Sequence, residues 1–425
     1  MGLFIKYLLA IGFAALAMGC QIVLLPWLAV AELQLEASQV GWVQSAVLLP
    51  GVLLMLFGGA FADRSGAVRA LPVLYFLLAL CHGLMLWQVG MGWLMLPILL
   101  GYALLLGICN AFLQPLRDKV LPQFIGQQVS LQTAVVQIGL CVYVAQAVGV
   151  ALAGHMDSLG VSTILAVQAV ALLISAALFV QLLRQHRKQS LHWQQRRPSV
   201  DSFSFDSLIE QQQRGDRSDA QSPMVSIAAG LKFVRHHRVL KHLMLLVGFN
   251  GFMHIGVFVV ALPLLARDIY QQDALYFSGL QLAFVGGNIV ATLGLLAKGQ
   301  VHHQGRWLLF SLLYAGMIMM AISIQPTAIG LLLLVLAWGV VAGISTSLGK
   351  SLLHQQVSEE YRGRVLSIYQ LALFGGAPLG ALACGYAVNL WGALSLFQVG
   401  GLLSLGLFAV YWGVRPLWKD SSSAQ

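Results

Sequence analysis

Apolar segments long enough to cross a membrane recur from one end of the chain to the other, and this feature restricts its fold most. A membrane-spanning α-helix needs about 20 consecutive, mainly apolar residues. Twelve such helices are predicted, at 7–30, 39–61, 71–90, 94–115, 129–154, 159–183, 239–263, 273–297, 307–324, 328–352, 361–388 and 391–412. The pattern therefore indicates an all-α polytopic membrane protein with twelve transmembrane helices.

The composition agrees with a lipid environment. Apolar residues make up 59% of the chain and charged residues 9%, whereas soluble domains contain about 25% charged residues. A soluble enzyme with a single anchor is excluded. The short breaks at Met91–Gly92 and Asn389–Leu390 predict tight turns between antiparallel helices. A β-barrel is disfavoured because its strands would alternate apolar and polar residues.

The distribution of charge predicts the orientation. The net charge is +9. If the N-terminus is cytoplasmic, nearly every Lys and Arg falls in a cytoplasmic break, and only Arg267 lies outside. The outer breaks instead contain Glu32, Glu36, Asp157, Asp268 and Asp273. We therefore expect a multi-pass protein of the cytoplasmic (inner) membrane, surrounded by lipids, with both termini in the cytoplasm and no nucleic-acid partner.

The chain contains an internal repeat. The segment Leu25–Ala29 (LPWLA) ends the first predicted helix, and Leu262–Ala266 (LPLLA) ends the seventh. Gln44 and Gln281 follow them at the same offset, so two independent matches share one register. Transporters are often built from two such halves around a central site. The predicted domains are a six-helix bundle at 1–183, a cytoplasmic linker at 184–238, a second six-helix bundle at 239–412 and a cytoplasmic tail at 413–425.

The break after the second helix carries the most specific motif, Gly59-Ala-Phe-Ala-Asp63-Arg64-Ser-Gly66-Ala-Val-Arg69. It resembles the Gly-x-x-x-Asp-Arg/Lys-x-Gly-Arg/Lys loop of the major facilitator superfamily, although Ala67 and Val68 precede the final basic residue. The resemblance implies a major facilitator fold, a monomeric secondary transporter of a small molecule, and gating roles for Gly59, Asp63, Arg64, Gly66 and Arg69.

The second half departs from that loop and adds a further resemblance. Lys298 stands where the repeat would place an acid. In the eleventh helix, Gly375-Gly-Ala-Pro378-Leu-Gly380 is similar to drug and siderophore exporters, including the enterobactin-exporter-like branch. This similarity implies efflux and a gating role for Pro378. The fifth helix, however, lacks the Gly-Pro pair that is usual in antiporters of the family.

Placing an ionisable side chain at membrane depth costs several kcal/mol of free energy, so a residue of this kind is first considered a functional candidate. His254 lies one helical turn from Asn250, so the two share a face of the seventh helix. In the family that this chain resembles, the seventh helix lines the cavity, which implies substrate binding by both residues and proton coupling by His254. Asp118 and Glu32 are further proton-coupling candidates. The alternative for His254 is a hydrogen bond between packed helices.

Uncharged polar residues supply the remaining binding candidates. Asn110 and Gln114 lie one turn apart on the fourth helix. Other candidates for binding the solute are Gln21, Gln137, Gln281 and Asn288. With the many Met, Phe and Trp residues, these amides predict an amphiphilic cavity, although amides also join helices without binding a solute.

The leading hypothesis is proton-coupled export of a small amphiphilic solute, such as a drug or siderophore. An uptake permease, a lipid flippase and a membrane sensor that binds without transporting are the alternatives. No Walker loop, zinc-ligand cluster or Ser-His-Asp arrangement is evident. We therefore expect neither an enzyme nor a site for a metal or cofactor.

Overall fold

The structure is a computed structural model that describes residues 2–63, 67–124, 131–195, 231–299, 301–357 and 359–414. Within these ranges, twelve helical segments are long and apolar enough to cross a membrane. This confirms the predicted all-α fold with twelve membrane spans.

The N-terminal half contains the first six spans. They are α1 (Leu3–Trp27), which continues through the π-helical turn η1 (Leu28–Glu32), α2 (Ala37–Asp63), α3 (Ala70–Gly90), α4 (Leu96–Phe124), α5 (Leu131–Gly154) and α7 (Val161–Gln195). The 3-10 turn η2 (Ala67–Arg69) precedes α3, and the short helix α6 (Met156–Leu159) precedes α7.

The C-terminal half contains the other six. The seventh span is composite: α10 (Arg238–Phe249), the π-helical turn η3 (Asn250–Ile255), α11 (Gly256–Leu264) and the π-helical turn η4 (Leu265–Ile269) follow without a break. The remaining spans are α12 (Ala274–Lys298), α13 (Gln304–Ser323), α14 (Ala328–Gln356), α15 (Glu359–Trp391) and α16 (Ala393–Val414).

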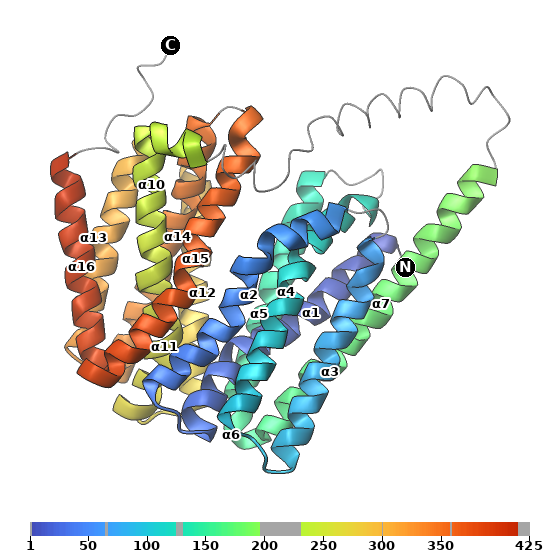
Figure 1. Cartoon of the computed structure of the whole chain (residues 1–425), viewed down its shortest axis with the longest axis horizontal. Coiled ribbons are helices and arrows are strands. Elements are labelled where there is room, and N and C mark those ends of the chain that lie inside the picture. Colours follow the sequence, from blue (N-terminus) through green and yellow to red (C-terminus); the bar gives the residue numbers. More distant parts are fainter. Residues whose placement is uncertain are drawn as a thin grey trace.

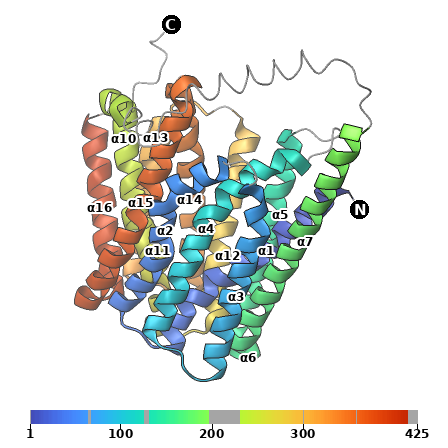
Figure 2. The ribbon, with the colours of Figure 1, turned by 45° about the vertical axis from the view of Figure 1, so that its right-hand side comes forward.

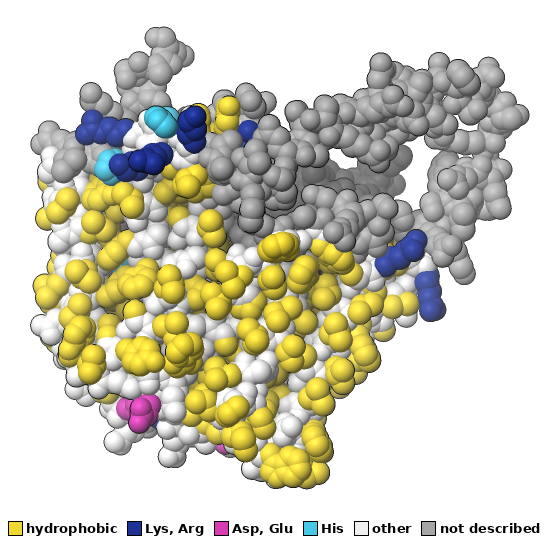
Figure 3. All heavy atoms as spheres, viewed as in Figure 1, with side chains coloured by type: hydrophobic (Ala, Val, Ile, Leu, Met, Phe, Trp, Pro, Cys, Tyr) yellow, Lys and Arg dark blue, Asp and Glu magenta, His cyan; other side chains and the backbone are white. Residues whose placement is uncertain are grey.

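The two halves stand side by side (Figures 1 and 2). The end of α7, the start of α10 and the end of α16 all lie at the upper end of the molecule in Figure 1, which we call the linker end. The opposite end, with the α3–α4 turn, α6 and the α11–α12 turn, is the far end. In Figure 3, Lys and Arg side chains lie near the linker end, acidic side chains lie at the far end, and a broad apolar belt separates them.

Glycines allow close helix contacts at equivalent places in the two halves. A Cβ on Gly149 of α5 would overlap the Leu16 carbonyl of α1, and a Cβ on Gly380 of α15 would overlap the Phe252 carbonyl of η3. Only a residue without a side chain permits backbones to approach so closely. The pairing of the first span with the fifth is therefore repeated by the seventh with the eleventh.

Several helix boundaries differ from the sequence-based ranges; α4, for example, ends at Phe124 instead of 115, and the seventh span ends at Ile269 instead of 263. Helix α7 continues to Gln195 instead of ending at 183, so the predicted linker begins with helical residues. The turn before α16 lies at Gly392, with φ of 82°, and the predicted turn at 389–390 is inside α15. A positive φ is readily adopted by glycine, which explains why the chain turns there. The predicted turn at Met91–Gly92 is confirmed, and Gly92 has φ of 69°.

Candidate functional site

A cavity of about 240 Å³ lies between the two halves at the middle of the helices. Its walls come from five helices of the N-terminal half and from α11 and α12 of the C-terminal half. The lining residues are Ala17, Met18, Gln21, Ile22, Leu25, Pro26, Gln44, Val47, Leu78, His82, Leu106, Asn110, Leu172, Phe258, Val259 and Gln281. We call this space the central cavity.

Hydrogen bonds fix Gln21 at the wall of the central cavity. Its Oε1 accepts from the Tyr102 hydroxyl at 2.9 Å and from Gln168 Nε2 at 3.0 Å. Gln168 is fully buried and also donates to the Ala17 carbonyl at 3.0 Å. The carbonyl end of Gln21 is thus occupied, while its amide end is free to donate elsewhere.

Two amide donors in the lining have no partner within the described protein. Gln21 Nε2 and Gln44 Nε2 are both buried, and neither has a hydrogen-bond acceptor among the described residues. A buried donor without a partner costs about 1–3 kcal/mol. An acceptor oxygen of a solute in the central cavity would remove that cost, so the two amides are suited to binding one.

His82 adds an acceptor to the same wall. Its side chain is 3% exposed, and Nδ1 lies 2.7 Å from the Leu78 carbonyl of the preceding turn. Because a carbonyl oxygen can only accept, Nδ1 carries the proton in the neutral ring and Nε2 is an acceptor. The His82 and Tyr102 rings are nearly perpendicular, with their centroids 5.5 Å apart.

The central cavity is uncharged where the structure describes it. Its lining contains no Asp, Glu, Lys or Arg, and His82 is the one titratable side chain among the lining residues. Apolar side chains form most of the wall. The arrangement suits a neutral molecule with an apolar body and a few oxygen or nitrogen atoms, since an ion would find no opposite charge there.

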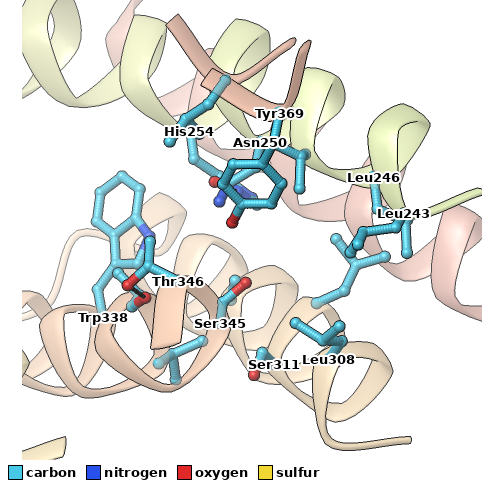
Figure 4. A pocket seen from close by; sticks show the side chains of 16 residues that line it. Leu243, Leu246, Asn250, His254, Leu308, Ser311, Trp338, Ser345, Thr346 and Tyr369 are labelled. Carbon is cyan, nitrogen blue, oxygen red and sulfur yellow. Dashed lines mark hydrogen bonds between the residues drawn. The ribbon is translucent and has the colours of Figure 1, made fainter. Parts of the chain in front are cut away.

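A second, smaller chamber of about 50 Å³ lies within the C-terminal half (Figure 4). His254 of η3 is 7% exposed at its edge; its Nδ1 is 2.8 Å from Asn250 Oδ1, and its Nε2 is 3.1 Å from Ser404 Oγ. The chamber also contains Trp338, Ser345 and Thr346 of α14. We call it the histidine chamber.

The predicted binding residues separate into several places. Gln21, Asn110 and Gln281 line the central cavity, while Asn250 and His254 line the histidine chamber. Gln114 is exposed and accepts from Arg117 at 2.5 Å, and Gln137 is exposed on α5. Asn288 donates to the Phe284 carbonyl of its own helix at 3.1 Å. Glu32 is exposed at the far end, and the side chain of Asp118 lies outside the described part.

The predicted gating loop is described only in part. Gly59 and Asp63 belong to α2, but their surroundings lie outside the description, as do Arg64 and Gly66 altogether. Arg69 ends η2 and is exposed. In the second half, Lys298 ends α12, and its Nζ lies 4.9 Å from the Trp307 ring centroid.

Pro378 lies where α15 meets α2. Its carbonyl oxygen accepts from the Ser45 hydroxyl at 2.5 Å. Further toward the far end, Asn389 of α15 donates to Ser38 of α2 at 2.9 Å. A Cβ on Gly41 would overlap the Ala381 carbonyl, so these two helices are in backbone contact.

Asp157 of α6 joins the halves at the far end. Its Oδ1 accepts from the indole N–H of Trp27 at 3.2 Å, and its Oδ2 accepts from the backbone N–H of Ala274, the first residue of α12, at 2.8 Å. The Trp27 ring stacks on Phe277, with the centroids 5.8 Å apart. Arg267 nearby contacts Asp268 and donates to the Val30 carbonyl of η1.

Sequence reasoning missed three of these residues. Gln44 was recognised as a repeat partner of Gln281 but not as a binding residue, and both line the central cavity. The shared repeat register was the signal that could have identified it. For His82, the signal was an ionisable residue inside a predicted span, although it was not chosen as a binding residue. Asp157 carried no local pattern, because its partners come from helices distant in the sequence.

Comparison of the sequence with known protein families identifies one that matches most of the chain. The sequence profile of the Major Facilitator Superfamily matches residues 7–348. The chain belongs to the Major Facilitator Superfamily. No match to a curated protein is found.

Solved structures of superfamily transporters share this fold. A mutant form of the nucleoside transporter NupG superposes with a TM-score of 0.68 and 13% identity over 98% of this chain and 100% of that one. A POT family transporter in complex with a thioalcohol-conjugated peptide gives 0.71 and 11%, covering 98% and 96%. The inward-open xylose transporter XylE from E. coli gives 0.65 and 13%, covering 99% and 97%.

Proposed function

We propose that this chain exports a small, uncharged, amphiphilic solute across the cytoplasmic membrane by alternating access, driven by the proton gradient. The central cavity carries the proposal: it lies between the halves at mid-depth, is lined from both, and offers the unpartnered donors Gln21 and Gln44 within an apolar wall. Solute sites of superfamily transporters lie at the interface of the repeats near the bilayer midplane.

The charge at the two ends supports a cytoplasmic location for the linker end. Basic residues gather there, and acidic residues lie at the far end (Figure 3). Lys and Arg are enriched in cytoplasmic segments of membrane proteins. The domain limits expected from the sequence, with a linker at 184–238 and a tail at 413–425, belong to the same proposal.

The contacts between the halves support an inward-facing state. Asp157 with Ala274, Ser38 with Asn389, and the Trp27–Phe277 stack all join the halves toward the far end. If that end faces the outside, these contacts close the outer gate. The described conformation then receives solute from the cytoplasm, as an exporter needs.

The direction and the kind of solute rest on the eleventh helix and on the cavity chemistry. The segment 375–380, with Pro378 in contact with Ser45, resembles drug and siderophore exporters. An uncharged lining favours a solute that is neutral, or made neutral, when it binds. A monomer would suffice, since both walls of the cavity come from one chain.

Transport by everted membrane vesicles tests the proposal. Vesicles containing the protein are incubated with a mixture of neutral drugs and siderophores under an imposed proton gradient, and the accumulated compounds are identified by mass spectrometry. We expect accumulation that falls several-fold in Gln44→Met, which removes an unpartnered donor at nearly constant volume and leaves the hydrogen bonds of Gln21 to Tyr102 and Gln168 in place. The matched control Gln114→Met alters an exposed amide outside the central cavity and should transport normally.

Other outcomes identify the alternatives. Accumulation only in right-side-out vesicles would indicate an uptake permease, and movement of labelled phospholipid between leaflets would indicate a flippase. Binding of a compound without accumulation in either orientation would indicate a sensor. Each of these results would contradict export.

A further inference from the structure

We propose that His254 is a proton-binding site, held in a chamber apart from the central cavity, and that Trp338 and Phe258 connect it to that cavity. Its coupling to transport rests on the proposed function, whereas proton binding can be tested alone. The arrangement separates the two ligands, so a proton and a solute would influence one another through the protein and not by competing for one space.

The hydrogen bonds around His254 can serve both protonation states. Nδ1 donates to Asn250 Oδ1 at 2.8 Å, and Nε2 lies 3.1 Å from Ser404 Oγ, which is 2.8 Å from the Gly400 carbonyl. In the neutral ring, the Ser404 hydroxyl donates to Nε2. After protonation, Nε2–H donates to Ser404 Oγ, and the hydroxyl turns to donate to Gly400. Rotation of one hydroxyl therefore keeps both ring nitrogens hydrogen-bonded.

Three hydroxyl side chains line the histidine chamber together with His254. They are Ser311 of α13 and Ser345 and Thr346 of α14 (Figure 4). By the bounds of the two helices, each lies in the half of its helix nearer the linker end. The chamber volume of about 50 Å³ exceeds the 10–15 Å³ or so that one water molecule requires. Hydroxyls and enclosed water are the usual elements of proton transfer, so a proton could reach His254 without entering the central cavity.

The surroundings of His254 provide no charge to offset a bound proton. Facing elements contribute Ser311 from α13, Trp338 from α14, Tyr369 from α15 and Ser404 from α16. Tyr369 is the other titratable group among the described lining residues. An uncompensated buried charge is costly. Protonation should therefore disfavour this conformation, in which the far end is closed, and return to it should favour release of the proton.

An aromatic chain links the two chambers. The His254 and Trp338 rings meet edge to face with centroids 6.2 Å apart, and Trp338 meets Phe258 in the same way at 5.7 Å. Phe258 lines the central cavity. His254 also belongs to the π-helical turn η3, a kind of wide turn that is common at functional sites. Movement of this turn would shift Phe258 and alter the central cavity.

Histidine NMR tests proton binding without any solute. The protein is labelled at its histidine rings, placed in nanodiscs and titrated between about pH 4 and pH 9, which spans the usual range of imidazole. The signal missing from His254→Gln is assigned to His254. We expect it to change from the neutral to the protonated form in one step. The same step should be seen in the control His242→Gln, which changes a histidine of α10. A His254 signal that stays neutral throughout would overturn the proposal.

Ser404→Ala keeps His254 and removes the hydroxyl that accepts from its protonated form. Since a hydrogen bond to a charged group is roughly twice as strong as a neutral one, we expect the step to move to a lower pH, with about a tenfold loss of proton affinity. This variant also identifies the signal if His254→Gln does not fold. An unshifted step would overturn the hydroxyl exchange.

Spin-label distances test the connection from His254 through Trp338 to the central cavity. The labels are placed at Met91 and Gln325, which are exposed at the far end of opposite halves. In a cysteine-free protein that keeps His254, lowering the pH should increase the share of molecules whose far end is open. In Trp338→Leu, which interrupts the aromatic chain, this increase should be at least several-fold smaller. An acid response equal in both proteins would overturn the connection. Because no solute is used, failure of the vesicle assay would challenge export and leave these results standing.

Discussion

Replacing Asp157 by Asn should open the outer gate. The carboxylate accepts from the Ala274 N–H at 2.8 Å, at the N-terminus of α12, and from the Trp27 indole at 3.2 Å. Asn keeps the shape but removes the charge and presents an NH₂ group toward one of two donors. A carboxylate at a helix N-terminus contributes about 0.3–1 kcal/mol when exposed. Asp157 is exposed, so we take about 1 kcal/mol, or about a fivefold change in an equilibrium.

Spin-label distances between Met91→Cys and Gln325→Cys measure that equilibrium. We expect Asp157→Asn to raise the ratio of molecules with an open far end to molecules with a closed far end about fivefold. Asp273→Asn is the matched control. Asp273 caps the same helix by accepting from Tyr276 N at 2.9 Å, but Asp273 and Tyr276 both lie in the C-terminal half, so this hydrogen bond does not join the halves. It should weaken the cap without opening the gate. Equal effects of the two substitutions, or no effect of Asp157→Asn, would refute a bridging role.

Three further predictions follow from the packing, the cavity and the gating loop. Gly339→Ala places a Cβ against the Phe284 carbonyl and should destabilise the fold by about 1–3 kcal/mol, seen as earlier thermal unfolding in detergent, whereas Gly286→Ala, with open space at its Cβ, should not. Gln44→Met should weaken equilibrium binding of the exported solute about fivefold, the equivalent of one hydrogen bond of about 1 kcal/mol, without lowering thermal stability. Asp63→Asn should lower transport turnover and leave solute affinity within a few-fold, as measured on equal amounts of folded protein; wild-type turnover would contradict its gating role.

The sequence predicts the helices well because each span must satisfy its backbone internally and present apolar side chains to lipid. Those demands act locally and leave a pattern at each span. Helix ends depend on finer detail: the turn at Gly392 was predicted two residues early because apolar residues continue on both sides of it. In α7, the polar residues beyond 183 continue the helix outside the apolar segment.

The candidate site was less accessible to sequence reasoning because spacing along one helix does not say which neighbours that helix faces. Asn250 and His254 do share a face and are hydrogen-bonded, but the face points into the histidine chamber. Asn110 and Gln114 are equally one turn apart, yet Asn110 lines the central cavity and Gln114 is exposed beside Arg117. Which amides meet is decided by how the two halves pack.

Alternating exposure of the central cavity is the central claim, and accessibility of one cysteine at Asn110 tests it most directly. Asn110→Cys is made in a cysteine-free chain, alone and with Asp157→Asn, and treated with a membrane-impermeant maleimide in inside-out and right-side-out vesicles. We expect the single variant to react from the cytoplasmic side, and the addition of Asp157→Asn to increase labelling from outside and reduce it from inside. Reaction from the cytoplasmic side alone, unchanged by Asp157→Asn, would contradict alternating access.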